Sequence, residues 1–323
     1  MKYDILTIGD ALEDVFVEPE LKVRADQSVL SGKSMNLEFG EKIPLNWVNF
    51  EIGGSACNAA VGFERLGAKS CIIAMCGDDD PKDKVIKRLR SEKVDCSNII
   101  VNKHYQTGYS VVLSVKGERT ILVFHGPKDY SKIKIDRNIE TEWLYLAPLG
   151  HNTDELEKDI VSFAAEKDVK IGWNPGSIQI KQGVNHWKHV LRCTNILFLN
   201  KEEALKFLGT PVRLEMREIL KRLHAYGPKI VVVTNGKEGA VAYDGVEFNA
   251  AKPDLRVEKV DATGAGDSFA IGFLARLMNA DWRLGVTPDE IREALNWGIK
   301  NSNSVIQYIG AQRGLLTLAQ MKR

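Results

Sequence analysis

The sequence predicts an α/β fold: a doubly wound, mainly parallel sheet flanked by helices, with a small additional β-sheet. Three observations lead to this prediction. Short apolar segments alternate with amphipathic helical segments over most of the 323 residues. Near-continuous apolar runs, as at 230–233, suit strands that are buried on both faces of a sheet. Two regions, near 11–50 and 99–125, contain strand patterns with no helix between them.

The elements of the main sheet follow from apolar periodicity and from turn residues. Gly67 directly follows an expected helix, in a position where glycine is favoured. Thr287 and Glu290 form a capping box that should open a helix running to about residue 305. Phe269, Phe273 and their neighbours recur at helical spacing. We expect strands at 4–9, 70–76, 143–147, 169–173, 196–199 and 229–234, and helices at 57–66, 81–92, 153–166, 201–207 and 214–226.

The two regions outside this alternation predict a small β-sheet appended to the core. A hairpin is expected from 109–115 and 119–124, with its turn at 116–118. Such a sheet is typical of a lid over an active site, although a hairpin that only extends the sheet edge is the alternative. We find no linker, so one domain over 1–323 is expected.

Composition excludes several classes of function. Lys and Arg number 44 against 43 Asp and Glu, which gives no electrostatic basis for binding nucleic acid or an anionic membrane. The chain has no apolar run near the roughly 20 residues that span a bilayer, and no signal peptide is recognisable. Its five cysteines lack metal-site spacing and are expected to be reduced thiols. We therefore expect a cytoplasmic protein.

A glycine-containing turn at 261–267 leads directly into the helical pattern near the C-terminus. The backbone N–H groups around Gly264, Ala265 and Gly266, together with the helix dipole, are suited to binding phosphate. Asp267 places a carboxylate where the anion would bind. Residue types alone leave two interpretations open: a general base beside a transferred phosphoryl group, or an acidic residue that stabilises the first helical turn. The turn matches neither a Walker A loop nor the dinucleotide fingerprint.

Other polar segments follow predicted strands and are weaker signals. Glycines at 53–54 allow close approach to a ligand, and acidic residues at 10–14 follow the first strand. The segment 200–203 offers oxygen ligands for Mg²⁺ but equally forms a helix cap. His186 and His189 are three residues apart without a third metal ligand nearby in the sequence, which favours surface or packing roles.

Taken together and in order, these segments resemble the ribokinase-like (PfkB) carbohydrate kinase family. The resemblance covers essentially the whole chain and rests on Gly-Gly-x-x-x-Asn at 53–58, Asn-x-x-Glu at 200–203 and Asp-x-Thr-Gly-Ala-Gly-Asp at 261–267. It implies the ribokinase-like fold with a β lid. It also implies phosphorylation of a primary hydroxyl of a sugar by ATP, with Mg²⁺ as cofactor.

The resemblance implies roles for individual residues. Asp267 would accept the hydroxyl proton as general base, and the N–H groups of Gly264, Ala265 and Gly266 would form the anion hole. A potassium or sodium site would involve Asp261 and Thr263, and Mg²⁺ or its waters would be held by Asn200 and Glu203. The acceptor would contact Asp14, Gly53, Gly54 and Asn58, and the nucleotide would contact Asn174, Asn200, Glu203, Thr234, Gly236, Gly239 and Gly310.

Departures from the family pattern leave the acceptor open. Residues 173–176 replace the Asp-x-Asn-x-Arg of some sugar-acid and fructose kinases, and Leu12 replaces a polar sugar contact of ribokinases. The alternatives are a nucleoside (adenosine-like) kinase, with Phe16, Trp47 or Tyr109 stacking on the base, and a catalytically silent sugar-binding regulator. A homodimer formed through the lid is compatible with the sequence, although no residue pattern requires it.

Overall fold

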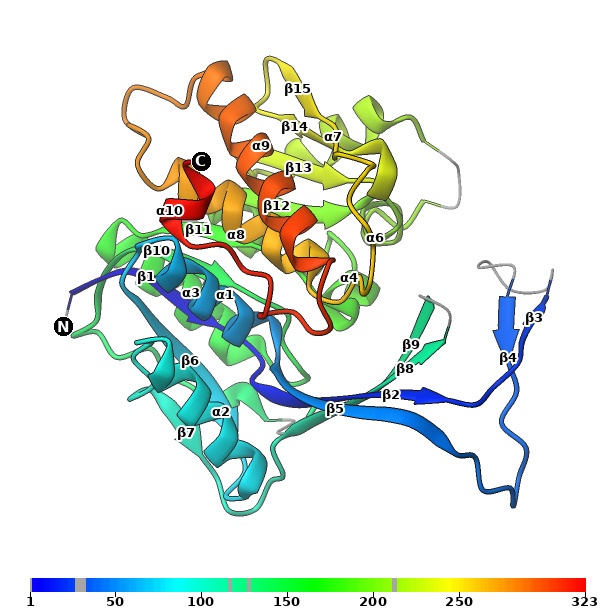
Figure 1. Cartoon of the computed structure of the whole chain (residues 1–323). Coiled ribbons are helices and arrows are strands. Elements are labelled where there is room, and N and C mark those ends of the chain that lie inside the picture. Colours follow the sequence, from blue (N-terminus) through cyan, green and yellow to red (C-terminus); the bar gives the residue numbers. More distant parts are fainter. Residues whose placement is uncertain (1, 27–32, 116–117, 127–128, 211–213) are drawn as a thin grey trace.

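The computed structural model of the chain describes residues 2–26, 33–115, 118–126, 129–210 and 214–323. Its centre is a nine-stranded sheet in the order β15-β14-β13-β12-β11-β10-β1-β6-β7 (Figure 1). Neighbouring strands from β7 to β13 are parallel, and β14 and β15 add an antiparallel edge. The strands are β1 (Lys2–Ile8), β6 (Ser70–Cys76), β7 (Ile99–Val101), β10 (Glu140–Leu146), β11 (Lys170–Trp173), β12 (Thr194–Asn200), β13 (Ile230–Thr234), β14 (Ala240–Tyr243) and β15 (Phe248–Ala251).

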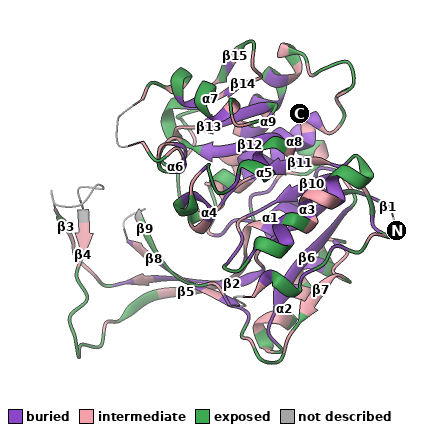
Figure 2. Ribbon diagram, turned by 180° about the vertical axis from the view of Figure 1, so that it is seen from behind, coloured by how far each residue is buried: buried purple, intermediate pink, exposed green. Residues whose placement is uncertain are grey.

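Helices cover both faces of this sheet, because successive strand side chains point to opposite faces and both are apolar. Ile5 packs into one core and Leu6 into the other. Figure 2 shows the central strands largely buried and the outer helix faces exposed. One core is covered by α1 (Ser55–Arg65), α2 (Asp80–Ser91), α8 (Ala265–Leu277), α9 (Pro288–Val305) and α10 (Leu318–Met321). The other is covered by α3 (Asp154–Lys167), α4 (Ser177–Gln182), α5 (Lys188–Cys193), α6 (Lys201–Phe207) and α7 (Met216–His224).

Two glycines bring α8 and α9 into close contact. A Cβ on Gly272 would lie 2.6 Å from the Trp297 carbonyl oxygen, and one on Gly298 would lie 2.9 Å from the Phe269 carbonyl oxygen. The predicted capping box opens α9, where the Thr287 side chain accepts from the Glu290 N–H. Together these contacts fix α8, which carries the glycine turn at its N-terminus. No helix in the described ranges is long and apolar enough to cross a bilayer.

A second, four-stranded sheet projects from the body of the molecule (Figure 1). Its strands are β2 (Leu12–Pro19), β5 (Leu45–Gly53), β8 (Gly108–Val115) and β9 (Glu118–Phe124), in the order β5-β2-β8-β9. The short pair β3 (Val23–Ala25) and β4 (Lys33–Met35) lies at its far end. We call the four-stranded sheet the lid sheet. The predicted α/β fold with a small additional sheet is thus confirmed.

Some details differ from the sequence prediction. β7 (Ile99–Val101) pairs with β6 at the edge of the large sheet and does not belong to the lid sheet, because its backbone completes the parallel ladder. Most of the predicted turn, residues 116–117, lies outside the described residues. The helices α4, α5 and α10, the edge strands β14 and β15, and the 3₁₀ turns η1 (Tyr130–Lys132) and η2 (Gly236–Glu238) were not expected.

Candidate active site

Eight of the predicted site residues line one cavity of about 420 Å³. It lies where β11, β12 and β13 end and where α8 begins, which is the edge at which α/β sheets bind ligands. Its walls contain Asn174, Asn200, Glu203, Thr234, Gly264, Ala265, Gly266 and Asp267. Segments that are far apart in the sequence therefore meet, because β11, β12 and β13 are parallel neighbours whose ends lie beside the start of α8.

A second cavity of about 330 Å³ adjoins the first. The two share Thr234, Ala262, Ala265, Gly266 and Phe269 in their walls. The second cavity also contains the predicted Gly236 and Gly239, and its other walls include Leu255, Val257, Ile299 and Ile306. An apolar chamber beside a chamber that contains the N-terminus of a helix is suited to a ligand with an apolar part and an anionic part.

Asp267 lies in the first turn of α8 and is half-buried in the larger cavity. Burial raises the pKa of its carboxyl, while hydrogen bonds from Asn58 and Ser55 act in the opposite direction. The Asn58 Nδ2 donates to Asp267 Oδ2 over 2.9 Å. A carboxylate with a raised pKa that lines a cavity can accept a proton from a bound hydroxyl.

The turn before α8 depends on Gly264. This residue is the N-cap of the helix with φ of 75°, and a Cβ there would lie 2.4 Å from the Ala311 Cβ. The N–H of Ala265 donates to the Ala262 carbonyl over 3.2 Å, whereas the first helical turn leaves the N–H groups of Gly266 and Asp267 without intrahelical partners. A Cβ on Gly266 would meet no atom within 4 Å, so the backbone there is open to a ligand.

Asp261 organises the residues around this turn. Its carboxylate accepts from the Thr263 N–H (3.0 Å), the Thr263 hydroxyl (2.8 Å) and the Gly310 N–H (3.1 Å). Gly310 thus contacts the site through Asp261 and lines neither of the two cavities. Arg119 Nη1 of the lid sheet lies 3.9 Å from Asp261 Oδ1, and Arg119 lines the larger cavity.

Asp14 lies on the lid strand β2, close to the same acidic group. Burial raises its pKa to about 6, and the charges of Asp261, Asp267 and Glu51 act in the same direction, against a hydrogen bond from Ser110. A Cβ on Gly53 would lie 2.0 Å from Asp14 Oδ2, so only glycine leaves room for this carboxylate. Gly54, with φ of 91°, places α1 next to the backbone of Asp10.

Asn58 is engaged at both ends of its amide. Besides its bond to Asp267, its Oδ1 accepts from Gln312 Nε2 over 3.1 Å, and the side chain is buried. The structure therefore gives Asn58 a contact with Asp267, and its contact with an acceptor stays a prediction. Asp10, the other early carboxylate, accepts from the Tyr130 hydroxyl and lies 3.6 Å from His125 Nδ1.

Asn200 and Glu203 form the capping box of α6. Asn200 Oδ1 accepts from the Glu203 N–H and Glu203 Oε2 accepts from the Asn200 N–H, each over 2.9 Å. Both side chains also line the cavity of Asp267. Burial raises the pKa of Glu203, and the charge of Asp267 adds to this. Oxygen donors facing the same cavity are the ligands that Mg²⁺ prefers, directly or through water. The cap and the metal role are thus compatible.

Known proteins are similar to this chain in sequence and in fold. The pfkB family of carbohydrate kinases matches residues 28–318. The chain belongs to this family. It is 25% identical to an ATP-dependent 6-phosphofructokinase of Thermoanaerobacterium thermosaccharolyticum, over 96% of this chain and 90% of the relative. It is 28% identical to a cytidine kinase of Thermococcus kodakarensis, over 76% and 88%. The structure of Arabidopsis thaliana ribokinase with ribose and ATP superposes with a TM-score of 0.79 at 19% identity, covering 100% and 98%.

This pfkB-family chain is therefore a phosphotransferase with an alcohol acceptor, of the sugar and nucleoside kinase type. The fold prediction is confirmed by the family and by the ribokinase-like architecture. The alternative of a catalytically silent regulator, which the sequence left open, is set aside because the chain belongs to a family of kinases. A small molecule is the substrate.

Sequence reasoning missed three cavity or near-cavity residues of this kinase. Ser55 bonds to Asp267 and lies inside the predicted segment 53–58, so its hydroxyl could have been singled out there. Arg119 lies on a lid strand and Gln312 near the C-terminus, and no local pattern distinguishes either residue. Only the packing of distant segments brings them to the site.

Proposed function

We propose that this kinase transfers the γ-phosphoryl group of ATP to a primary hydroxyl of a sugar, with Asp267 as the general base. The observation that carries the proposal is the position of Asp267: a half-buried carboxylate of raised pKa beside free N–H groups of a helix N-terminus. The acceptor hydroxyl would lose its proton to Asp267 as its oxygen attacks phosphorus.

The transferring phosphoryl group would lie against the first turn of α8. There the backbone of Gly264, Ala265 and Gly266 and the helix dipole would stabilise its negative charge. Ala265 would have to release the Ala262 carbonyl to donate. Arg119 supports this arrangement, because it brings a positive charge from the lid sheet into the same cavity. Closing the lid would then both place this charge and exclude water.

The nucleotide would occupy both cavities, with its base between the apolar walls and its phosphates near α8. Asn174, Thr234, Gly236 and Gly239 would contact it, and Gly310 would act through Asp261. Asn200 and Glu203 would hold Mg²⁺, which supplies positive charge to the phosphates when bound. Asp261 and the Thr263 carbonyl would belong to a potassium or sodium site, which is consistent with the central place of Asp261 among the loops.

The acceptor would lie between Asp267 and the root of the lid sheet. Asp14 is the strongest candidate for binding its hydroxyls, because a buried carboxylate among other carboxylates gains most from hydrogen-bond donors. Gly53 and Gly54 leave space for the acceptor. Asn58 could contact the acceptor only by giving up its hydrogen bond to Asp267 or to Gln312. A nucleoside is the second candidate acceptor, because half-buried Trp47 and Tyr109 of the lid could stack on a base, whereas Phe16 is fully buried.

We further propose that residues 1–323 act as one kinase domain and that two copies pair through their lid sheets. The outer strands of the lid sheet expose apolar side chains that a single copy leaves uncovered. Leu45, Val48 and Phe50 on β5 and Ile121, Leu122, Val123 and Phe124 on β9 are each at least 40% exposed. Such edges and patches favour association with another chain.

A coupled assay of ADP release tests the proposed activity. The full-length chain is supplied with ATP and Mg²⁺ and screened over pentoses, hexoses, their phosphates and nucleosides, with and without potassium. We expect one acceptor class to raise ADP release well above background. Phosphorylation of nucleosides alone would favour the second candidate. Background release with every acceptor would contradict the proposed function, provided that the protein is folded and binds ATP.

A further inference from the structure

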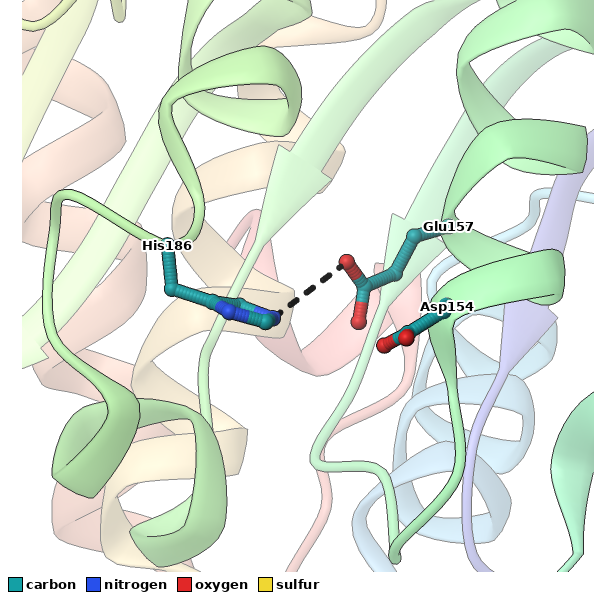
Figure 3. Close-up of side chains that lie close together, drawn as sticks. All are labelled: Asp154, Glu157 and His186. Atoms are coloured by element: carbon teal, nitrogen blue, oxygen red, sulfur yellow. Dashed lines mark ion pairs between the residues drawn. The ribbon is translucent and has the colours of Figure 1, made fainter.

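Four side chains with metal-ligating atoms meet outside the candidate active site. Asp154 and Glu157 lie in the first turn of α3, His186 lies between α4 and α5, and His189 lies in the first turn of α5. None of the four lines either cavity described above. Figure 3 shows the carboxylates of Asp154 and Glu157 and the ring of His186 turned toward a common point. The sequence shows no further ligand near the histidines, but the packing of α3 against α5 brings two carboxylates to them in space.

The distances are close to those of a coordination site. Ligand atoms of Asp154, Glu157 and His186 all lie within 4.8 Å of one another. The Nε2 atoms of His189 and His186 lie 3.2 Å and 3.8 Å from the same oxygen, Oε2 of Glu157. With metal–ligand bonds of about 2.0 Å, the ligand atoms of a tetrahedral site are about 3.3 Å apart. Small side-chain rotations would therefore complete the site.

The burial of Glu157 is the second observation that points to an ion. Its side chain is only 2% exposed, and its other oxygen, Oε1, accepts from the Thr153 hydroxyl. Burying a carboxylate is unfavourable unless a positive charge compensates it. Asp154 brings further negative charge to the same point. A bound cation would compensate both carboxylates and use the imidazoles as neutral ligands.

We propose that Asp154, Glu157, His186 and His189 bind a divalent transition-metal ion of the zinc type. Two imidazole nitrogens and two carboxylate oxygens are a ligand set that suits zinc and its neighbours better than magnesium. The Thr153 hydroxyl would orient the Glu157 carboxylate from behind. An ion could enter from solvent, since the side chains of His186 and His189 are 39% and 44% exposed.

The ion would fasten two segments that form one wall of the candidate active site. Gln179 of α4 already joins these segments: its Oε1 accepts from the Gly176 N–H (3.1 Å) and the Leu149 N–H (3.3 Å), and its Nε2 donates to the Leu149 carbonyl (2.9 Å). The neighbouring Pro148 and Gly176 line the cavity of Asp267. A metal between α3 and the α4–α5 connection would add a second cross-link to the same pair of segments. The proposed role is therefore structural.

Zinc titration of the full-length chain tests this proposal directly. The protein is first treated with a chelator and then kept in excess Mg²⁺, which occupies sites that prefer oxygen ligands. Zinc binding is measured by calorimetry for the wild type, for the double variant His186→Ala/His189→Ala and for Glu157→Gln. His104→Ala removes an exposed imidazole from another part of the chain and is the matched control. Cobalt binding, followed by its visible absorption, reports whether the site is tetrahedral.

We expect one zinc ion per chain and a rise in Tm on zinc addition. The double variant should lose at least about tenfold in zinc affinity and most of the rise in Tm. Even the mutation of a residue that only hydrogen-bonds to a metal ligand lowers metal affinity by about 10–100-fold. The control variant should bind as the wild type does. Wild-type protein that shows no saturable zinc binding, or a double variant that keeps wild-type affinity, would overturn the proposal. If Glu157→Gln fails to fold, zinc binding by the double histidine variant still decides the outcome, because both histidines are partly exposed.

Discussion

At the scale of single residues, the candidate site combines several carboxylates that repel one another. Asp14 has a pKa raised to about 6, first by burial and then by the charges of Asp261, Asp267 and Glu51. Asp267 also has a raised pKa. A cluster of this kind weakens the fold unless a ligand compensates it, which is typical of a site arranged for binding and catalysis.

The substitution Asp14→Asn should separate stability from function. Between about pH 4 and 6, Asp14 keeps its proton in the folded chain but loses it in the unfolded chain. The free energy of unfolding therefore falls as the pH rises through this range. Asparagine does not titrate, so the variant should not lose stability in this pH range. We expect the variant to be more stable than the wild type at about pH 8, by about 3 kcal/mol, and nearly equally stable near pH 4.

Denaturant unfolding at the two pH values measures this difference, and KM for the acceptor should rise in the same variant. Glu247→Gln, at an exposed carboxylate between β14 and β15, is the control and should show neither effect. A stability difference that is equal at both pH values would show that the charge of Asp14 is not its cause.

The contact of Asn58 with Asp267 predicts a shift in the pH profile. The Asn58 amide lowers the pKa of Asp267 by donating to its Oδ2. In Asn58→Ala the pKa of the base should rise further, so the acidic limb of kcat should move to higher pH. Asn46→Ala, an exposed amide of β5, is the control. If Asn58 only binds the acceptor, KM should change without any movement of this limb.

At the scale of elements, the N-terminus of α8 should respond differently at its two glycines. Gly264→Ala forces alanine into a left-handed backbone conformation and against Ala311. We expect the free energy of unfolding to fall by about 2 kcal/mol or more, and kinase activity to be lost as well. Gly266→Ala meets no atom within 4 Å and should keep wild-type stability, while its methyl group narrows the cavity and weakens ATP binding. Thermal unfolding and ATP titration test both variants. Equal stability of the two would contradict the role given to Gly264.

Most of the elements could be predicted because their signals are local. The apolar run of β13 and the capping boxes of α6 and α9 are visible in neighbouring residues. β7 could not be assigned to the large sheet, because a three-residue strand takes its partner from the fold. The glycine turn was recognised for the same local reason. Arg119, Gln312 and the pairing of Glu157 with the histidines arise from contacts between distant segments, which no spacing in the sequence indicates.

At the scale of the whole molecule, the proposed dimer would form through the lid sheet. Val48→Asp places a charge on its outer strand, where the side chain is 47% exposed. We expect this variant to fold and to sediment as a monomer, while the wild type sediments as a dimer. Val246→Asp is the matched control, because Val246 is 83% exposed in the turn between β14 and β15. A wild type that remains monomeric at high concentration would contradict pairing through the lid.

The central claim is that Asp267 is the general base of a phosphoryl transfer, and Asp267→Asn tests it most directly. Turnover and ATP affinity are measured with the acceptor that the screen identifies. Glu247→Gln, at an exposed carboxylate between β14 and β15, serves as the control. We predict that Asp267→Asn lowers kcat by on the order of 10²–10⁴ while ATP affinity is largely kept. An Asp267→Asn variant with near-normal turnover would contradict the account.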